Sequence, residues 1–279
     1  MFKSVGLVAR YDKKQALELV EELAEYLKSE NVQVCIEDTL AGKVNTQGEM
    51  VSLTKMKTDF VITIGGDGTI LRTRIALPKP EPPILAVNMG VRGFLTEVEP
   101  KEACAAVEKC LKGEFKLEKC AKLAAAMDGY VIPDALNDIV ISAGEPLKIL
   151  YTQIFEDKKP ILKCQADGLI LATQTGSTGY SLSAGGPVLD PEVDAFVLTP
   201  ICSLTVFRSL VFPADSKVTI KATRPKRVLV VVDGNYRQVV TSKNPTLTVT
   251  RSKNASWFIR FKDDFYHRLQ NRVLFKGTG

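Results

Sequence analysis

Residues 60–72 read FVITIGGDGTILR, and this stretch decides the class of fold that we expect. Its first five residues have the composition of a buried strand, and three glycines then interrupt the run. A helix is predicted to start near Thr69. A buried strand, a glycine-rich turn and a helix in succession form the unit that builds parallel α/β sheets. The stretch therefore predicts an open α/β sheet with a glycine-rich loop at the carboxyl end of one strand.

Short apolar runs at residues 4–10, 33–37 and 83–87 extend this pattern in both directions. Between the first two, apolar residues recur at helical spacing over residues 16–27. Strands that alternate with helices indicate successive βαβ units. We therefore predict an α/β domain over residues 1–100 that carries the glycine motif.

The pattern changes after a helix predicted at residues 101–112. Strand-like segments then follow one another with no room for crossover helices, at 115–127, 135–142, 149–155 and 161–164. Helical spacing returns over residues 263–275. We predict a β-rich domain of the β-sandwich type over residues 101–260, and a C-terminal helix within 261–279 that returns to the first domain.

The composition is that of a globular protein, with 45% hydrophobic and 25% charged residues among 279. No stretch approaches the roughly 20 apolar residues of a membrane helix, so we expect a cytoplasmic protein without a membrane partner. The net charge of +5 is modest and its basic residues are scattered, so we expect no nucleic-acid partner. Because His267 is the single histidine, a general base should be sought among the carboxylates.

The glycine motif GGDGT at residues 65–69 contains a carboxylate where phosphate is expected. It is neither a P-loop nor a dinucleotide fingerprint, since Leu71 stands where the third glycine belongs. Glycine N–H groups and a helix N-terminus favour phosphate, and Asp67 opposes it unless a cation or a proton is involved. Asp67 could help to hold a divalent metal, accept the proton of an attacking hydroxyl, or merely cap the helix.

Two further segments carry polar groups that suit a nucleotide. Residues 166–187 are dense in hydroxyls and glycines, which can recognise sugar hydroxyls and base edges, although an irregular surface loop is the alternative. Asn137 and Asp138 interrupt a strand of alternating apolar residues. Since buried polar groups need partners, this pair lies either at an exposed sheet edge or against a polar ligand.

Together these segments resemble the motifs of the NAD kinase family. The similarity takes in GGDGT, the Asn-Asp pair, DGLILATQTGSTGYSLSAGGP at residues 167–187 and NMGVRGFLTE at residues 88–97, and it spans nearly the whole chain. GGDGT alone is shared with diacylglycerol and sphingosine kinases, so it indicates only phosphoryl transfer. The longer motif indicates the nucleotide.

The resemblance implies transfer of a phosphoryl group from ATP or polyphosphate, with Mg²⁺, to the adenosine-ribose 2′-hydroxyl of NAD. It also implies the two-domain fold of the family and a homodimer or homotetramer. Asp67 would be the general base. The other residues matched to the family's contacts with NAD and phosphate are Gly66, Gly68, Thr69, Arg72, Phe94, Asn137, Asp138, Asp167, Thr178, Gly179, Tyr180 and Ser183.

Some positions depart from the family pattern. Asp138 replaces the commoner Glu, Gly179 replaces the commoner Ala, and Gln165 stands in place of an Arg that would contact a phosphate or ribose. Residues 233–235 read DGN, which predicts a hairpin turn or a contact with ligand or a neighbouring subunit. Asn235 is therefore included among the candidate NAD contacts.

Two other functions are compatible with parts of this pattern. A lipid or sphingoid kinase would share GGDGT, but it requires an apolar acceptor pocket, and the hydroxyl-rich residues 173–183 argue against one. A regulator that binds NAD or NADP without chemistry would keep the longer motif and have no need of Asp67. Turnover distinguishes a kinase from such a regulator.

Overall fold

The computed structural model describes residues 2–90, 93–262 and 265–270. The chain divides into two compact units, Met1–Lys119 with Ser256–Gly279, and Cys120–Ala255. Strands β6 (Lys116–Met127) and β17 (Thr246–Arg260) carry the chain across the two boundaries. The two-domain NAD kinase-like fold class predicted from the sequence agrees with this architecture of an α/β unit and a β-rich unit.

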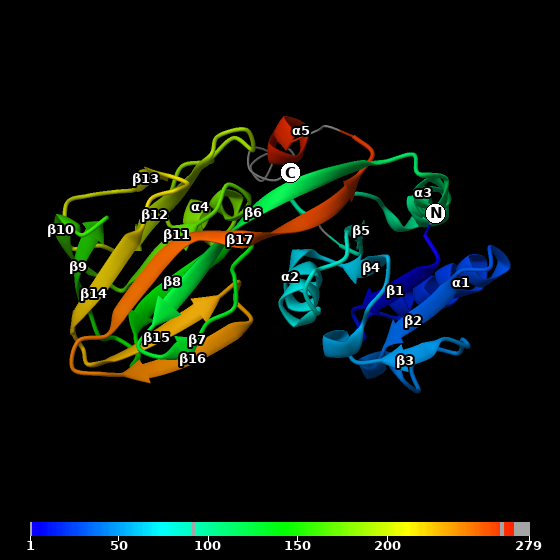
Figure 1. Ribbon diagram of the computed structural model, residues 1–279, viewed down its shortest axis with the longest axis horizontal. Coiled ribbons are helices and arrows are strands. Elements are labelled where there is room, and N and C mark those ends of the chain that lie inside the picture. Colours follow the sequence, from blue (N-terminus) through cyan, green and yellow to red (C-terminus); the bar gives the residue numbers. More distant parts are fainter. Residues whose placement is uncertain (1, 91–92, 263–264, 271–279) are drawn as a thin grey trace, which may run out of the picture. The chain divides into compact units, whose positions relative to one another are not determined.

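The first unit is built on a parallel sheet whose strands lie in the order β3-β2-β1-β4-β5, with the end of β17 beside β5 (Figure 1). The apolar runs of the sequence become fully buried strands because helices cover both faces of the sheet. The strands are β1 (Ser4–Ala9), β2 (Gln33–Glu37), β3 (Glu49–Val51), β4 (Phe60–Gly65) and β5 (Ile84–Asn88).

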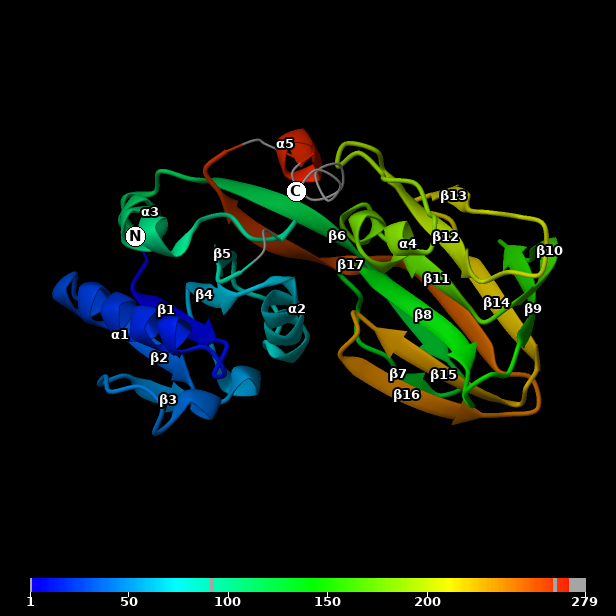
Figure 2. The same ribbon diagram turned by 180° about the vertical axis from the view of Figure 1, so that it is seen from behind.

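Helices α1 (Lys14–Ser29) and α3 (Ala103–Lys112) pack on one face of this sheet, and Figure 2 shows α1 in front of β1 and β2. Their apolar stripes join the buried residues of β1, β4 and β5 in one core. On the other face, η2 (Leu53–Lys55) and the end of α2 (Asp67–Ala76) pack against β1 and β4. The short helices η1 (Asp38–Leu40) and η3 (Pro100–Glu102) lie in the connections.

The bounds of the two compact units differ from those of the predicted domains, whose boundaries were expected at residues 100 and 260. Ala103, Val107 and Cys110 of α3 are buried in the core of the first unit, so residues 101–119 belong there. At the other boundary, Phe258 of β17 pairs with Ile84 of β5. The C-terminal helix is described as α5 (Phe265–Leu269), and the rest of the predicted helix, residues 263–264 and 271–275, lies outside the described residues.

The second unit consists mainly of two antiparallel sheets, drawn as separate layers in Figures 1 and 2. One has the order β10-β9-β14-β17, with β6 and β7 beside it, and the other has the order β13-β12-β11-β8-β15-β16. The remaining elements are β7 (Tyr130–Val131), β8 (Asp138–Ala143), β9 (Leu150–Glu156), β10 (Lys159–Ala166), β11 (Gly168–Ala172), η4 (Thr175–Thr178), α4 (Tyr180–Ser183), β12 (Ala195–Ile201), β13 (Leu210–Pro213), β14 (Val218–Arg224), β15 (Arg227–Val232) and β16 (Tyr236–Thr241).

Strands of the second unit form where buried and exposed side chains alternate along the sequence. In β14 the side chains of Val218, Ile220 and Ala222 are buried while their neighbours are not, as expected for a sheet with one solvated face. Residues 233–235 form the turn between β15 and β16, which is the hairpin predicted from the sequence.

In the described part of the chain, no helix has both the length and the apolar character needed to cross a membrane.

Candidate functional site

The glycine motif lies at the point where the strand order of the first unit reverses. β1 runs between β2 and β4, so the chain leaves the carboxyl ends of β1 and β4 in opposite directions. Open α/β sheets bind ligands at such a position. Gly66 is the N-cap of α2, which begins at Asp67, two residues earlier than the predicted start at Thr69.

Asp67 is held by the segment that follows β5. Its Oδ2 accepts the backbone N–H of Phe94 at 3.0 Å, and its Oδ1 accepts that of Leu95 at 3.2 Å. A Cβ at Gly93 would lie 2.0 Å from Oδ1, so this close approach requires glycine. Because each carboxylate oxygen has two lone pairs, these bonds fix Asp67 and leave it able to accept a proton.

The glycines at the start of α2, Gly66 and Gly68, leave open space beside the helix N-terminus. A Cβ at Gly66 or Gly68 would meet no atom within 4 Å. Thr69 is buried, with its Oγ1 packed against the Cα of Gly65. The N–H groups of a first helical turn attract phosphate oxygens when nothing obstructs them. This geometry suits a phosphate at Gly66 and Gly68.

Arg72 forms an ion pair with a carboxylate inside the first unit. Its guanidinium donates to both oxygens of Glu37, one contact being 2.9 Å, and the Glu37 side chain is 1% exposed. The hydrogen bonds that Arg72 donates to the Glu37 carboxylate raise the pKa of Arg72. The charge of Arg72 is thus balanced by Glu37, and its contact with a phosphate stays a prediction.

A lysine that the sequence analysis did not select lies at the same edge of the sheet. Lys13, at the start of α1, donates from Nζ to the carbonyl of Met89 at 2.5 Å, directly after β5. Beside it, Asn88 donates to the carbonyl of Gly90 at 3.0 Å, and its buried Oδ1 has no partner among the described residues. A cation and an amide oxygen therefore accompany the phosphate-attracting helix terminus.

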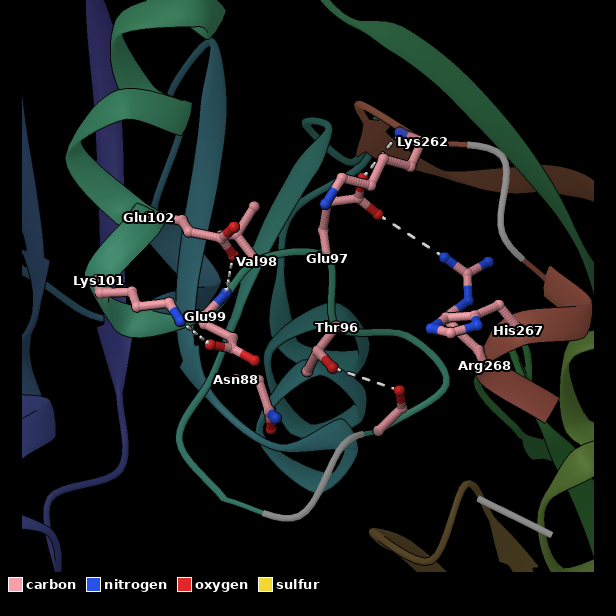
Figure 3. Close-up of a pocket in the computed structure, with 11 residues that line it drawn as sticks. Asn88, Thr96, Glu97, Val98, Glu99, Lys101, Glu102, Lys262, His267 and Arg268 are labelled. Atoms are coloured by element: carbon pink, nitrogen blue, oxygen red, sulfur yellow. Dashed lines mark hydrogen bonds and ion pairs between the residues drawn. The ribbon is translucent and has the colours of Figure 1, made fainter. Parts of the chain in front are cut away.

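A pocket of about 420 Å³ opens near the end of β5 (Figure 3). Charged side chains of both signs line it, and Glu97 pairs there with Arg260 at 3.1 Å and with Arg268 at 3.8 Å. Asp67 is not among the described residues that line this pocket. We therefore assign the chemistry to the strand ends and not to this pocket.

The segment of Asn137 and Asp138 lies in the interior of a sheet in the second unit. β8, which begins at Asp138, pairs with β11 on one side and β15 on the other, so the pair does not lie at a sheet edge. The Asn137 Oδ1 atom is buried and has no hydrogen-bond partner among the described residues. Of the two alternatives left open by the sequence, a polar ligand is the one that this position favours.

The hydroxyl-rich segment folds over the same strand. After β11, the N–H of Thr173 donates to the Asn137 carbonyl at 2.9 Å, and the Thr173 hydroxyl donates to the Leu136 carbonyl at 2.5 Å. A Cβ at Gly176 would lie 1.9 Å from the Asn137 carbonyl oxygen. The segment is thus a compact loop in contact with Asn137, and the alternative of an irregular surface loop does not describe it.

The other candidate residues of the second unit differ in exposure. Thr178 is buried and its hydroxyl donates to the Thr175 carbonyl at 3.0 Å, whereas Tyr180 is 47% exposed. Asp167, Ser183 and Asn235 are exposed, and Gly179 is partly buried between η4 and α4. In the first unit, Phe94 is buried with its ring 6.1 Å from that of Phe265. Their contacts with NAD stay predictions.

The carboxyl group of Asp138 has a raised pKa. Its side chain is buried, and burial, together with the nearby Asp233 carboxylate, raises the pKa of Asp138 to about 7. A carboxyl that binds its proton more tightly in the folded state stabilises the fold at low pH. That contribution is lost as the pH rises through the pKa of the folded state.

The replacement Asp138→Asn is therefore expected to have a pH-dependent effect on stability. Relative to the wild type, the variant gains about 3 kcal/mol in free energy of unfolding between pH 4.5 and pH 8, because Asn never ionises. Urea unfolding of both proteins at the two pH values measures this. An equal difference at both pH values would contradict the raised pKa.

Sequence reasoning selected Asp67 and the Asn-Asp pair, but it missed Lys13, Gly93 and the supporting role of Asp233. Gly93 lies in the NMGVRGFLTE motif, so it could have been selected from the sequence. No local sequence pattern distinguishes Lys13 from other lysines. Within residues 2–90, 93–262 and 265–270, no three His, Cys, Asp or Glu side chains are grouped to hold a metal ion.

Comparisons with known proteins identify the family of the chain. Residues 5–115 match the family model for the ATP-NAD kinase N-terminal domain, and residues 136–261 match that for the C-terminal domain. The NAD kinase of Methanothermobacter thermautotrophicus is 36% identical over 273 residues, which cover 97% of this chain and 96% of the relative. These relatives define the class of the protein as a kinase.

Solved structures share the fold. An NAD kinase from Archaeoglobus fulgidus in complex with ATP has a TM-score of 0.78 and 27% identity, covering 96% of this chain and 99% of that chain. Yeast NADH kinase complexed with NADH has a TM-score of 0.88 and 25% identity, covering 99% and 89%. The chain belongs to the NAD kinase family.

Proposed function

We propose that this kinase transfers the terminal phosphoryl group of ATP to the adenosine-ribose 2′-hydroxyl of NAD, giving NADP. The observation that carries the proposal is the position of Asp67, fixed by the N–H groups of Phe94 and Leu95 at the strand-order reversal. In this reaction Asp67 accepts the proton of the 2′-hydroxyl as its oxygen attacks the phosphorus. The bond from phosphorus to the bridging oxygen of the donor breaks, and ADP leaves.

In the proposed reaction, NAD is recognised by the second unit. The unpartnered Oδ1 of Asn137 accepts a hydrogen bond from a polar group of NAD, and Asp138 contacts a second one. The hydroxyls of Thr178 and Ser183 and the exposed ring of Tyr180 suit a ribose and an adenine. Asp167 and Asn235 supply polar groups toward the nicotinamide half.

The donor is proposed to be ATP, with inorganic polyphosphate as the alternative. The ATP complex of the Archaeoglobus fulgidus relative supports ATP. The open N-terminus of α2 at Gly66 and Gly68 would receive the phosphates, with Lys13 and Arg72 as nearby basic residues. A divalent cation such as Mg²⁺ would arrive bound to the donor's own phosphates.

The replacement Gly68→Ala tests this position for the donor. An added methyl meets no protein atom within 4 Å, so the free energy of unfolding should change by less than about 0.5 kcal/mol. The methyl would occupy space needed by a phosphate, so we expect KM for ATP to rise about 10-fold, with KM for NAD unchanged. An unaltered KM for ATP would contradict a phosphate at Gly68.

Turnover assays separate this proposal from its alternatives. Purified protein is incubated with Mg²⁺, ATP and either NAD or a sphingoid base, and the phosphorylated product is measured by mass spectrometry. We expect NADP and no sphingoid phosphate. Binding of NAD without any turnover would instead favour a regulator. Replacement of ATP by polyphosphate in the same assay identifies the donor.

Assembly and location stay predictions from the resemblance and the composition. The family resemblance implies a homodimer or homotetramer, which analytical ultracentrifugation would detect. A cytoplasmic location is expected from the sequence alone.

A further inference from the structure

The turn between β15 and β16 places a buried carboxylate against the strand that carries Asn137 and Asp138. Asp233, 4% exposed and with φ of 48°, accepts three backbone N–H groups in succession. Its Oδ2 accepts that of Leu136 at 2.9 Å, and its Oδ1 accepts those of Asn137 at 2.7 Å and Asp138 at 3.0 Å. Three such charge-assisted bonds to one buried side chain hold the path of a backbone firmly.

The opposite side of the same segment is held by the loop after β11. Thr173 donates its N–H to the Asn137 carbonyl and its hydroxyl to the Leu136 carbonyl, and Gly176 packs against Asn137 without a side chain. In return, the N–H of Asp233 donates to the Asp138 carbonyl at 3.0 Å. The N–H and C=O groups of the segment are thus bonded to protein, and the Asn137 Oδ1 is the atom left for another partner.

The charge of Asp233 also acts on Asp138. Neighbouring strands place Ala172 of β11 opposite Asp138 and Val232 of β15 opposite Ile139, so both flanking strands present apolar residues. Asp233, which follows Val232, is the charged group that acts on the Asp138 side chain from this turn. A like charge at close range favours the protonated form of the neighbour, which can donate as well as accept a hydrogen bond.

We infer that Asp233 is a positioning residue for NAD: its carboxylate fixes the backbone of residues 136–138 and so holds Asn137 and Asp138 in place for the ligand. The inference rests on the proposed function, because Asn137 and Asp138 are taken to contact NAD. The residue acts through its neighbours and does not itself contact the reacting atoms.

The test compares Asp233→Asn with a matched control, Asp157→Asn. Asp157 is also an aspartate with positive φ at a hairpin turn that accepts a backbone N–H, but it lies between β9 and β10. Asn at position 233 keeps the shape of Asp but has one acceptor oxygen and no charge, so it cannot accept all three N–H groups as the carboxylate does. We expect KM for NAD to rise about 10- to 100-fold, with KM for ATP within twofold of the wild type.

A pH profile separates positioning from a general loss of structure. The KM for NAD of the wild type should change around pH 7 as Asp138 ionises, and this inflection should move to lower pH in Asp233→Asn because the like charge is gone. Asp157→Asn should retain the wild-type KM and inflection. Folding of each variant is verified by circular dichroism.

Two results would overturn the inference. One is a folded Asp233→Asn protein whose KM for NAD stays within twofold of the wild type. The other is an equal rise in KM for NAD and in KM for ATP, with the inflection in the pH profile unmoved. That result would mean that Asp233 supports only the structure. A wild-type protein that forms no NADP refutes the proposed function instead, so the two failures are distinguishable.

Discussion

Replacing Asp67 by Asn is expected to lower kcat about 10²- to 10⁴-fold while NAD still binds. Asn cannot accept the proton of the 2′-hydroxyl, so the attacking oxygen must lose its proton without a base. The measured quantities are kcat from NADP formation and the dissociation constant of NAD from calorimetry. The expected result is a large loss of turnover with NAD affinity within a few-fold of the wild type.

The surroundings of Asp67 explain why the variant should fold. The carboxylate accepts two N–H groups, from Phe94 and Leu95. An Asn side chain accepts one of them through its carbonyl and presents an N–H to the other, at a cost of about 1–3 kcal/mol. Asp157→Asn, which makes the same replacement at the turn between β9 and β10 of the second unit, is the control and should retain most turnover. Full activity of folded Asp67→Asn would reject the assignment of the base.

The second large effect is expected at Gly176. Its Cβ position lies 1.9 Å from the carbonyl oxygen and 2.4 Å from the carbonyl carbon of Asn137, and backbone cannot rotate aside as a side chain does. In Gly176→Ala we expect the free energy of unfolding to fall by about 1–3 kcal/mol. We also expect KM for NAD to rise about 10²-fold, because Asn137 moves away from its position for binding.

Gly179→Ala provides the comparison for Gly176→Ala. Its added methyl would lie 3.3 Å from the Gly176 carbonyl oxygen and 3.7 Å from Nδ2 of Asn137, so a small adjustment accommodates it. We therefore expect a much smaller change in KM for NAD than in Gly176→Ala. Steady-state kinetics with varied NAD and thermal unfolding measure both variants. A Gly176→Ala protein with wild-type KM would contradict the proposed role of Asn137.

Local patterns predicted much of the fold. The apolar run, glycines and helix of residues 60–72 became β4, the turn and α2, because buried strands and helix starts have short-range signals. The predicted strand at residues 33–37 has the same bounds as β2. The sequence analysis did not assign α3 to the first unit. The apolar stripe of a helix indicates that one face is buried, but it does not indicate which sheet covers that face.

The candidate site residues that lie in motifs were selected from the sequence, and those that meet only in space were missed. Arg72 and Glu37 are 35 positions apart, so no local pattern revealed that this arginine has a buried partner. Asp233 lies 96 positions from Asn137, and its sequence context predicted the hairpin but not the three N–H bonds. Sheet order favours the ligand alternative over the edge alternative for Asn137 and Asp138, and sheet order is a long-range property.

The proposed product of this kinase carries its new phosphate on the adenosine ribose of NAD. ³¹P and ¹H NMR of the product that purified protein forms from NAD, ATP and Mg²⁺ tests this. We expect a new phosphomonoester attached at the adenosine 2′ position, with ADP formed in equal amount. Unchanged NAD, or a phosphate at any other position, would contradict it.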